Sequence, residues 1–402
     1  MLSFDEALEL VNQLSVPVHT ESVELDQAYG RVLAQPVLAS NDQPPFDRAT
    51  MDGYAVALAP GVTSYRVIDT ILAGAHFEGT LQAGEAVRIM TGAPCPGGAT
   101  VVAVERTNGG EAEVLIEPEA LEPGKNIAWK GQDARRGQTI LASGLRLAPQ
   151  TLSVAPGHGR GRKGLGSDRL LCYQNPSVGI VTTGDEIGAE GPAGVRNSNG
   201  PYLASLCTAL GLERRCYHAK DEREKLAATL AQAASEHEVV VTVGGVSMGT
   251  VDLVPQTAEA LGFRTLFHRV AMQPGKPVFL AQRADGKLLL GLPGNPVSVL
   301  VTAHLFLMPV LGRFQGGWQY PWQTRALAED LEHKGTRRLF LPARLGSDGV
   351  VPVRWNGSGD FFAAAQGDGL LDLQPGGVWK RGHGLRFLPY WGHTPGETGL
   401  AR

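Results

Sequence analysis

The segment Val239–Asp252 (VVVTVGGVSMGTVD) constrains the fold of this chain more than any other stretch. Its first five residues are all β-branched, which is typical of a strand buried on both faces of a parallel sheet. A glycine-rich loop follows directly, and such a loop exposes backbone N–H groups to an anion. Ligands of open α/β sheets bind where strands end and such loops begin. The loop is therefore a candidate binding site, and a tight turn with incidental polar residues is the alternative.

Two further segments have the same design. Val178–Glu186 (VGIVTTGDE) and Leu288–Pro296 (LLLGLPGNP) are apolar runs that end in small or polar residues. Helical patterns lie between the runs, over Tyr202–Leu210 and Glu224–Ala234. This alternation predicts a doubly wound parallel sheet from about 176 to 314. The loops that would meet at one sheet edge carry Asp185, Glu186, Ser247, Asp252 and Asn295.

Composition excludes several classes of protein. A formal net charge of −4 argues against a general nucleic-acid binder. The four cysteines are scattered without a C-x-x-C pair, so we expect neither a zinc site nor a disulfide framework, and a reducing cytoplasm is the natural compartment. The N-terminus lacks the pattern of a signal peptide. Val297–Leu311 is apolar but short and interrupted by polar residues, which favours a buried helix over a membrane span.

The rest of the 402-residue chain predicts smaller domains around this sheet. Ser3-Phe4-Asp5-Glu6 reads as a capping box that opens a helix through about Leu14. Short alternating runs between turn clusters, from Tyr65 to about Ile140, predict a small antiparallel β domain. A similar pattern beyond Trp318 predicts a β-barrel-like C-terminal domain. The predicted domains are 1–45 with 141–174 (helical and extended), 46–140 (small β), 175–318 (α/β) and 319–402 (C-terminal β).

Gly159–Gly164 formally matches the dinucleotide-binding pattern G-x-G-x-x-G. The pattern requires a strand before it and a helix after it, and the sequence shows neither. A flexible connection before the α/β domain is the better interpretation of this basic, glycine-rich segment.

Six sequence motifs occur in order along the chain. They are PPFDRATMDGYAV, RIMTGAP, TTGDEIG, GGVSMGTVD, QPGKP and GLPGNPVSV, and they span about Pro44 to Val299. Together they resemble the molybdenum insertases, the molybdopterin molybdenumtransferase (MoeA) family, to which the eukaryotic gephyrin E domain also belongs. The resemblance implies a four-domain, homodimeric enzyme with a central molybdopterin-binding α/β domain.

The resemblance also implies a reaction. Adenylylated molybdopterin and molybdate are the substrates, the adenylate is hydrolysed with Mg²⁺, and AMP is released while molybdenum remains on the dithiolene. Chemistry at a phosphoanhydride requires charge neutralisation and an oriented water, and a Mg²⁺ held by carboxylates provides both. The molybdopterin adenylyltransferase is a further partner that the resemblance suggests.

Matching the family motifs residue by residue implies three sets of site residues. The implied catalytic residues are Asp52, Asp133, Glu186 and Asp252. The implied metal ligands are Asp185, Glu186 and Asp252. The implied substrate-binding residues are Thr91, Asp221, Gly244, Gly245, Ser247, Arg269, Lys276, Pro293 and Pro296.

Each of several residues has a simpler interpretation. Asp52 could only shape a turn with the glycine that follows it. Asp133 could be a surface acid. Glu186 could cap the segment that follows it, and Asp221 could be only a helix N-cap. Lys276 could be a solvated cation, although its place between Gly and Pro favours an anion contact.

Three segments depart from the family pattern. The family commonly has two lysines four residues apart before PGKP, and here these positions are Arg269 and Gln273. A guanidinium can replace the first cation, but an amide supplies no charge in place of the second. The segments Gly357–Leu370 (GSGDFFAAAQGDGL) and Arg160–Lys163 are also atypical, which leaves the role of the C-terminal domain open.

Three rival functions remain from the sequence. A molybdopterin adenylyltransferase would share the α/β domain, but it has no need of residues 44–140. A gephyrin-like scaffold without catalysis would be expected to carry a fused partner or a long linker. A plain sugar- or nucleotide-binding module is disfavoured by the number of carboxylates. The sequence does not distinguish molybdate from tungstate as the preferred substrate.

Overall fold

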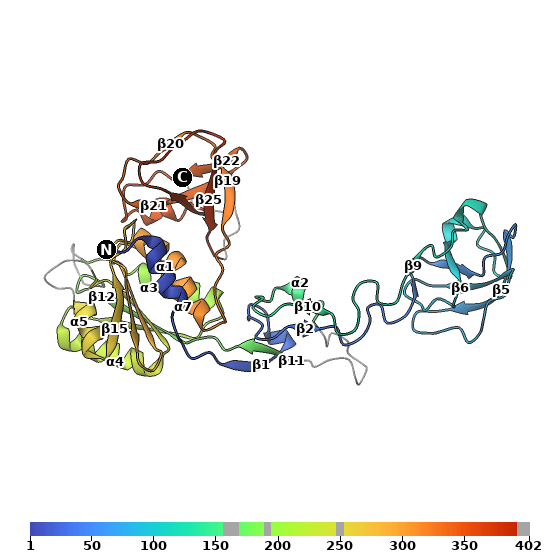
Figure 1. Ribbon diagram of the computed structural model, residues 1–402, viewed down its shortest axis with the longest axis horizontal. Coiled ribbons are helices and arrows are strands. Elements are labelled where there is room, and N and C mark those ends of the chain that lie inside the picture. Colours follow the sequence, from blue (N-terminus) through green and yellow to red (C-terminus); the bar gives the residue numbers. More distant parts are fainter. Residues whose placement is uncertain (156–168, 189–193, 247–252, 392–402) are drawn as a thin grey trace. The chain divides into compact units, whose positions relative to one another are not determined.

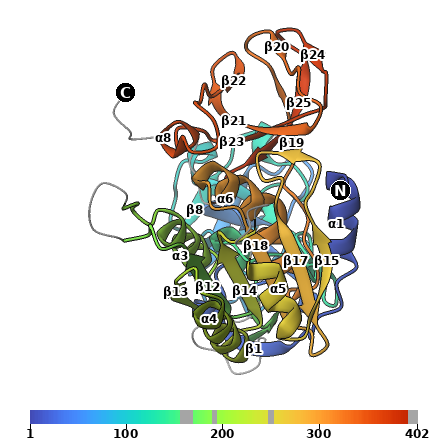
Figure 2. The ribbon, with the colours of Figure 1, turned by 90° about the vertical axis from the view of Figure 1, so that its left-hand side faces the viewer.

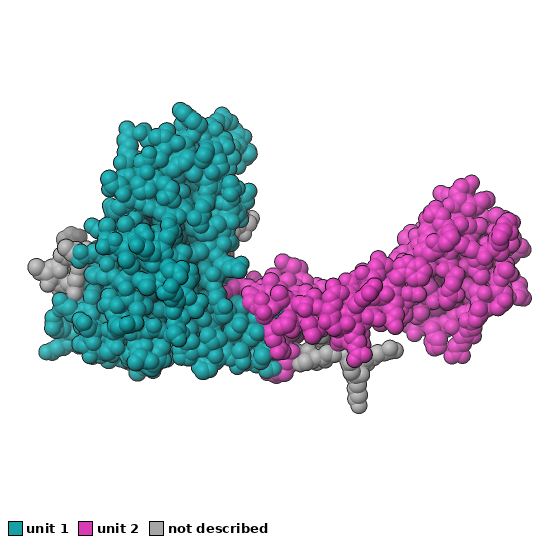
Figure 3. Space-filling view, viewed as in Figure 1, with its two compact units in different colours: residues 1–23, 30–34, 171–402 teal, residues 24–29, 35–170 magenta. Residues whose placement is uncertain are grey.

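The computed structural model describes residues 1–155, 169–188, 194–246 and 253–391. The chain forms two compact units, which Figure 3 distinguishes by colour. The first unit comprises residues 1–23, 30–34 and 171–402, and the second comprises residues 24–29 and 35–170. Figure 1 labels many of the helices and strands of both units.

A six-stranded sheet forms the centre of the first unit. Its strands, in spatial order, are β13 (Arg214–Ala219), β12 (Val178–Thr183), β14 (Val239–Val243), β18 (Leu288–Leu292), β17 (Phe279–Arg283) and β15 (Phe263–His268). Every residue of β12, β14 and β18 is buried, as their apolar runs predict. The first four strands are parallel, whereas β17 runs antiparallel to both of its neighbours. The predicted α/β architecture is confirmed, with one reversed strand.

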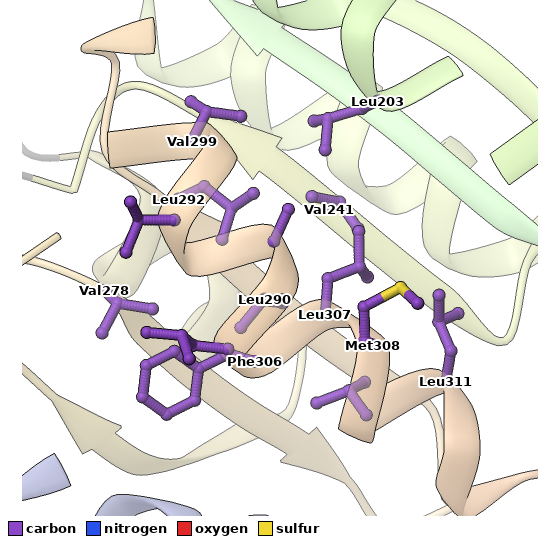
Figure 4. Close-up of a cluster of buried hydrophobic side chains, with 14 of the residues drawn as sticks. Leu203, Val241, Val278, Leu290, Leu292, Val299, Phe306, Leu307, Met308 and Leu311 are labelled. Carbon is purple, nitrogen blue, oxygen red and sulfur yellow. The ribbon is translucent and has the colours of Figure 1, made fainter. Parts of the chain in front are cut away.

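Helices cover both faces of this sheet. They are α1 (Phe4–Asn12), α3 (Asn199–Ala209), α4 (Arg223–Glu236), α5 (Leu253–Ala260), α6 (Pro296–Thr302), the π-helical turn η4 (Ala303–Leu307) and α7 (Met308–Arg313). One hydrophobic cluster contains side chains of α1, α3, α6 and α7, and another contains those of α4 and α5. Figure 4 shows Phe306, Leu307 and Met308 packed beside Val241 and Leu290 of the sheet. The sheet is therefore doubly wound.

The helical segment Pro296–Arg313 is long and apolar enough to cross a membrane by length and composition alone. However, 89% of it is buried inside the protein. It packs as the central core helix that its interruptions by polar residues predict.

The first helix, α1, begins with the predicted capping box. The Ser3 hydroxyl accepts a hydrogen bond from the Glu6 N–H at 3.2 Å, and the Glu6 carboxylate accepts one from the Ser3 N–H at 2.7 Å. The Phe4 ring packs against Phe306 and Phe340, with centroids 5.7 Å and 4.8 Å away. These contacts fix α1 within the core of the first unit.

The C-terminal part of the first unit is a β structure (Figure 2). Its main sheet has the order β16 (Met272–Gln273), β21 (Arg338–Gly346), β23 (Gly369–Leu373), β25 (Gly384–Pro389) and β19 (Gln323–Ala326), with β22 (Gly349–Pro352) paired to β21. A second pair joins β20 (Leu331–Glu332) to β24 (Val378–Trp379), and α8 spans Phe361–Ala364. Because β16 comes from the α/β segment and pairs with β21, the two parts share a sheet.

The second unit contains the small β domain. Its five-stranded sheet has the order β7 (Thr100–Ala103), β4 (Gly53–Val56), β6 (Glu85–Ile89), β5 (Ser64–Ile71) and β8 (Glu113–Leu115). The pairing is antiparallel as predicted, except that β5 and β6 are parallel. Two-stranded pairs join β3 (Arg48–Ala49) to β9 (Ile127–Ala128), and β2 (Val37–Leu38) to β10 (Thr139–Leu141). The remaining elements of this unit are α2 (Pro149–Leu152) and the 3-10 turns η1 (Leu25–Gln27), η2 (Val104–Arg106) and η3 (Pro118–Ala120). Strand β1 (Thr20–Glu24) pairs with β11 (Arg169–Tyr173), and most residues of both strands belong to the first unit.

Candidate functional site

Three loops meet at the carboxyl ends of β12, β14 and β18, as the sequence predicts. The Gly244 N–H donates to the Leu292 carbonyl at 3.1 Å, which joins the loop after β14 to the end of β18. The Thr183 hydroxyl donates to the Val243 carbonyl at 3.3 Å, which joins the ends of β12 and β14. This edge is where open α/β sheets bind ligands.

The loop after β14 requires its two glycines. Gly244 and Gly245 have φ angles of +93° and +65°, a region that side chains disfavour. A Cβ atom at Gly244 would lie 2.7 Å from the Thr183 hydroxyl, and one at Gly245 would lie 2.9 Å from Val254 Cγ2. The positive φ angles and the close approach of neighbouring atoms explain why both positions are glycine. Two predicted residues of this loop, Ser247 and Asp252, lie outside the described residues.

An acidic group lies at the same edge. The Asp221 N–H donates to the Asp185 carboxylate at 3.3 Å. Partial burial raises the pKa of Asp221, and the charges of Asp185 and Glu186 raise it further. The charges of Asp185 and Glu186 thus disfavour ionisation of Asp221. Within the described ranges, no group of three or more His, Cys, Asp or Glu side chains is arranged to hold a metal ion.

The capping alternative for Asp221 is wrong. Helix α4 has Glu222 at its N-cap position and no side-chain cap, so Asp221 does not cap it. The Glu186 side chain lies over Gly184, where an added Cβ would be 2.6 Å from either carboxylate oxygen.

The segment that contains Arg269 and Lys276 forms a closed turn after β15. The Arg269 N–H donates to the Val278 carbonyl and the Val270 N–H to the Lys276 carbonyl, both at 2.9 Å. Arg269 has a φ of +72°, in the left-handed region that few non-glycine residues adopt. Its side chain is half-buried, whereas that of Lys276 is exposed. Sequence reasoning did not single out His268, whose Nε2 atom lies 3.1 Å from the Val246 carbonyl oxygen.

The loop after β18 is held from two sides. The Asn199 side-chain amide donates to the Gly294 carbonyl at 2.7 Å, and that of Asn295 donates to the Ser358 hydroxyl at 2.8 Å. Pro293 is buried, and Pro296 occupies the first turn of α6, where its missing N–H is not needed. The prolines thus shape the loop as predicted, but the roles of Asn199 and Ser358 were not predicted.

The contact with Ser358 gives the atypical Gly357–Leu370 segment a structural role. The N–H of Val297, at the start of α6, donates a hydrogen bond to the Ser358 carbonyl at 3.1 Å. The Asp360 carboxylate caps α8 by accepting from the Ala363 N–H at 3.1 Å. Phe361 packs edge-on against Tyr202, with ring centroids 6.1 Å apart. The segment therefore fastens the C-terminal β structure to α3 and to the start of α6.

Asp52 and Thr91 form a pair within the second unit. Both the backbone N–H and the hydroxyl of Thr91 donate to Asp52 Oδ1 at 2.7 Å. The backbone bond is the main cause of a lowered pKa for Asp52, and the hydroxyl bond adds to it. The glycine that follows is also constrained, because a Cβ at Gly53 would lie 1.9 Å from the Val102 carbonyl oxygen. Asp52 is therefore held as a carboxylate and does more than shape a turn.

Asp133 also belongs to the second unit. Its side chain is exposed, and its backbone N–H donates to the Gln43 carbonyl at 2.9 Å. This position is equally compatible with a surface acid and with a site residue. The other predicted site residues that the structure describes belong to the first unit.

Two family models match the sequence. Residues 2–159 match a model described as the MoeA N-terminal region (domain I and II). Residues 179–313 match one described as a probable molybdopterin binding domain. The second match covers the central sheet and the three loops of the candidate site.

Curated relatives and solved structures agree with these matches. A molybdopterin molybdenumtransferase from Staphylococcus aureus is 34% identical over 406 residues, covering 95% of this chain and 94% of the relative. One from Staphylococcus epidermidis is 31% identical over 396 residues, covering 94% and 92%. A crystal structure of a molybdopterin biosynthesis MoeA protein from Pyrococcus horikoshii has a TM-score of 0.75 and 30% identity, covering 98% of this chain and 100% of that one.

Proposed function

Because the chain belongs to the molybdopterin molybdenumtransferase family, we propose that it inserts molybdate into adenylylated molybdopterin, hydrolyses the adenylate and releases AMP. The chain is a transferase of molybdenum cofactor biosynthesis, as its nearly full-length relatives are. The steps of the reaction are our proposal.

The observation that carries the proposal is the neighbourhood of the glycine loop and the acidic group. Gly244 and Gly245 follow β14, and Asp185 and Glu186 follow β12, the strand that pairs with it. A substrate that contains phosphate groups needs backbone N–H donors and a cation that neutralises its charge. The glycine loop supplies N–H donors, and the carboxylates beside it are of the kind that hold such a cation.

Mg²⁺ fits the donor chemistry of this edge. Carboxylate oxygens are the ligands that Mg²⁺ prefers, and one or two carboxylates with water usually suffice. Asp185 and Glu186 would hold the ion. Burial is the main cause of the raised pKa of Asp221, and the charges of these two acids, which an ion would offset, add to it. We assign Asp252 to the same ion from its motif. When bound, Mg²⁺ supplies charge neutralisation at the phosphoanhydride.

The chain's own residues bind and orient the substrates in this proposal. The backbone N–H groups of Gly245 and Val246 face phosphate or molybdate, since that of Gly244 donates to Leu292, and Arg269 and Lys276 contribute positive charge. Asp221 and the prolines of the Pro293–Pro296 loop shape the molybdopterin site. Asp52, fixed by Thr91, and Asp133 are the further acids that we assign to the reaction.

We further propose that the enzyme is a cytoplasmic homodimer and receives its substrate from the molybdopterin adenylyltransferase. The chain's scattered cysteines, without a C-x-x-C pair, support a reducing compartment. Several small modules around one α/β core leave apolar faces, which supports dimerisation. Phe46, Met51 and Trp129 are exposed on the second unit.

The rival enzyme, an adenylyltransferase, would use ATP and molybdopterin. The match of residues 2–159 to the MoeA N-terminal region argues against it. Offering the purified protein both substrate sets separates the two. We expect molybdenum in the isolated pterin product from adenylylated molybdopterin and molybdate, and no adenylylation of molybdopterin by ATP. Adenylylation without molybdenum transfer would contradict the proposal.

A further inference from the structure

The side chain of His268 links two segments of the candidate site. His268 is the last residue of β15, and its Nε2 atom lies 3.1 Å from the carbonyl oxygen of Val246. Because a carbonyl can only accept, Nε2 must carry the proton in this contact. The ring also packs edge-on against buried Phe279, with centroids 5.6 Å apart and an interplanar angle of 87°. The orientation of the imidazole is therefore fixed from two sides.

Within its described residues, 244–246, the bond to Val246 is the side-chain hydrogen bond that holds the glycine loop. The other hydrogen bonds described for Gly244–Val246 join backbone to backbone. They run from the Gly244 N–H to Leu292 at 3.1 Å and from the Val254 N–H to Gly245 at 3.4 Å. The bond from His268 comes from a side chain, so a substitution can remove it while the backbone contacts remain.

The same histidine adjoins Arg269. His268 pairs with Phe279 across β15 and β17, and the next N–H, that of Arg269, donates to Val278. Arg269 has a φ of +72°, so the direction of its side chain depends on how firmly the backbone on either side is held. One imidazole thus connects the end of the glycine loop to the backbone that carries the guanidinium.

We propose that His268 is a positioning residue for oxyanion binding, which keeps the Gly244–Val246 loop and Arg269 at a fixed separation. This inference rests on the proposed function, which assigns molybdate to these two segments. His268 itself makes no contact with the anion in this account. It acts through the carbonyl of Val246 and through the backbone of Arg269.

Calorimetric titration of the full-length protein with molybdate tests the proposal. His268→Phe keeps a ring against Phe279 but loses the N–H donor, and we expect the dissociation constant to rise roughly two- to tenfold, the usual effect of one neutral hydrogen bond. His268→Gln keeps an N–H donor that can reach Val246, and we expect an affinity within about twofold of the unmodified protein. Rescue by Gln separates positioning from loss of stability.

His237→Phe is the matched control. His237 is a buried histidine just before β14, and its ring lies 3.2 Å from the Ser177 hydroxyl and 2.9 Å from the Tyr217 hydroxyl. Its loss should lower the melting temperature and leave molybdate affinity unchanged. Three results would overturn the proposal: no molybdate binding by the unmodified protein, unchanged affinity in His268→Phe, or equal weakening in His268→Gln or His237→Phe.

AMP release, measured in parallel, keeps the two hypotheses apart. If the unmodified protein releases AMP and His268→Phe binds molybdate normally, the positioning role fails and the proposed function stands. If the unmodified protein binds molybdate but releases no AMP from adenylylated molybdopterin, the proposed function fails.

Discussion

Thr91 donates two hydrogen bonds, from its N–H and its hydroxyl, to the same oxygen of Asp52, each 2.7 Å long. Hydrogen bonds to the charged form lower the pKa of a carboxyl, so the Thr91 contacts keep Asp52 ionised to lower pH than usual.

Thr91→Val should therefore raise the pKa of Asp52, because it removes the hydroxyl donor while the backbone donor remains. Asp52 has a lowered pKa in the folded state, so its contribution to stability is present above its unfolded pKa and is lost as pH falls through the folded value. Carboxyl chemical shifts across an acid titration measure the effect. An unchanged Asp52 titration in Thr91→Val would show that the hydroxyl contact is absent in solution.

Asp185→Asn should lower the pKa of Asp221, since it removes one of the two neighbouring charges that raise it. Mg²⁺ should have the same effect if it binds this acidic group. A group with a raised pKa destabilises the fold as pH rises through that pKa, so Asp221→Asn should stabilise the protein at neutral pH. Glu238→Gln is the control. Glu238 lies just before β14 and accepts hydrogen bonds from Ser177, so this variant should leave the Asp221 titration unchanged.

Gly244→Ala should abolish most activity and destabilise the protein. It places a methyl group 2.7 Å from the Thr183 hydroxyl and adds the strain of a φ of +93°. Gly84→Ala is the matched control, because Gly84 has a φ of +81° and no atom within 4 Å of an added Cβ. The control should cost about 1–2 kcal/mol from backbone strain alone. Urea unfolding measures the loss of unfolding free energy in each variant. If Gly244→Ala and Gly84→Ala lose equal unfolding free energy and keep equal activity, the argument from crowding at Gly244 is contradicted.

Gln273→Lys should tighten molybdate binding, and Arg269→Ala should weaken it. A charge-assisted contact is typically worth about 1.5–3 kcal/mol, which corresponds to roughly ten- to a hundredfold in affinity. Calorimetry on both variants measures the changes. If neither variant alters the affinity, the turn is structural and the anion binds elsewhere.

Asp372→Asn should strongly destabilise the first unit. The buried Asp372 carboxylate accepts from Arg338 at 2.6 and 2.7 Å, and breaking a buried pair typically costs about 3–5 kcal/mol. Asp5 contacts the same guanidinium at 2.9 Å, but its side chain is 75% exposed. Asp5→Asn should therefore cost less than about 1 kcal/mol. Denaturant unfolding measures the loss of unfolding free energy in both variants. Equal losses would contradict the argument that the buried partner of Arg338 contributes more than the exposed one.

Local patterns explain why much of the fold could be predicted. The β-branched run Val239–Val243 forms β14, and the Ser3–Glu6 capping box opens α1, because both signals lie within a few neighbouring residues. The reversed direction of β17 was not predictable in this way, since an apolar run does not reveal strand direction. The parallel pairing of β5 with β6 was missed for the same reason.

The same distinction between local and long-range signals applies to the candidate site. The glycines after β14 and the acids after β12 belong to short motifs, so the sequence reveals them. The links from Asn199 to Gly294, from Asn295 to Ser358 and from His268 to Val246 join residues that are distant in the chain. Such contacts depend on tertiary packing and leave no periodic signal. His268 had one accessible sign, its place directly before Arg269 at the end of a strand.

The most direct test of the account is AMP release from adenylylated molybdopterin. The purified protein is incubated with this substrate and molybdate, with and without Mg²⁺, alongside the Asp185→Asn/Glu186→Gln double variant. We expect AMP release that requires Mg²⁺ and falls at least about tenfold in the double variant, a modest part of what a metal ion can contribute. Equal release by the variant, or release that does not depend on the metal, would contradict the assignment of this sheet edge as the reaction site.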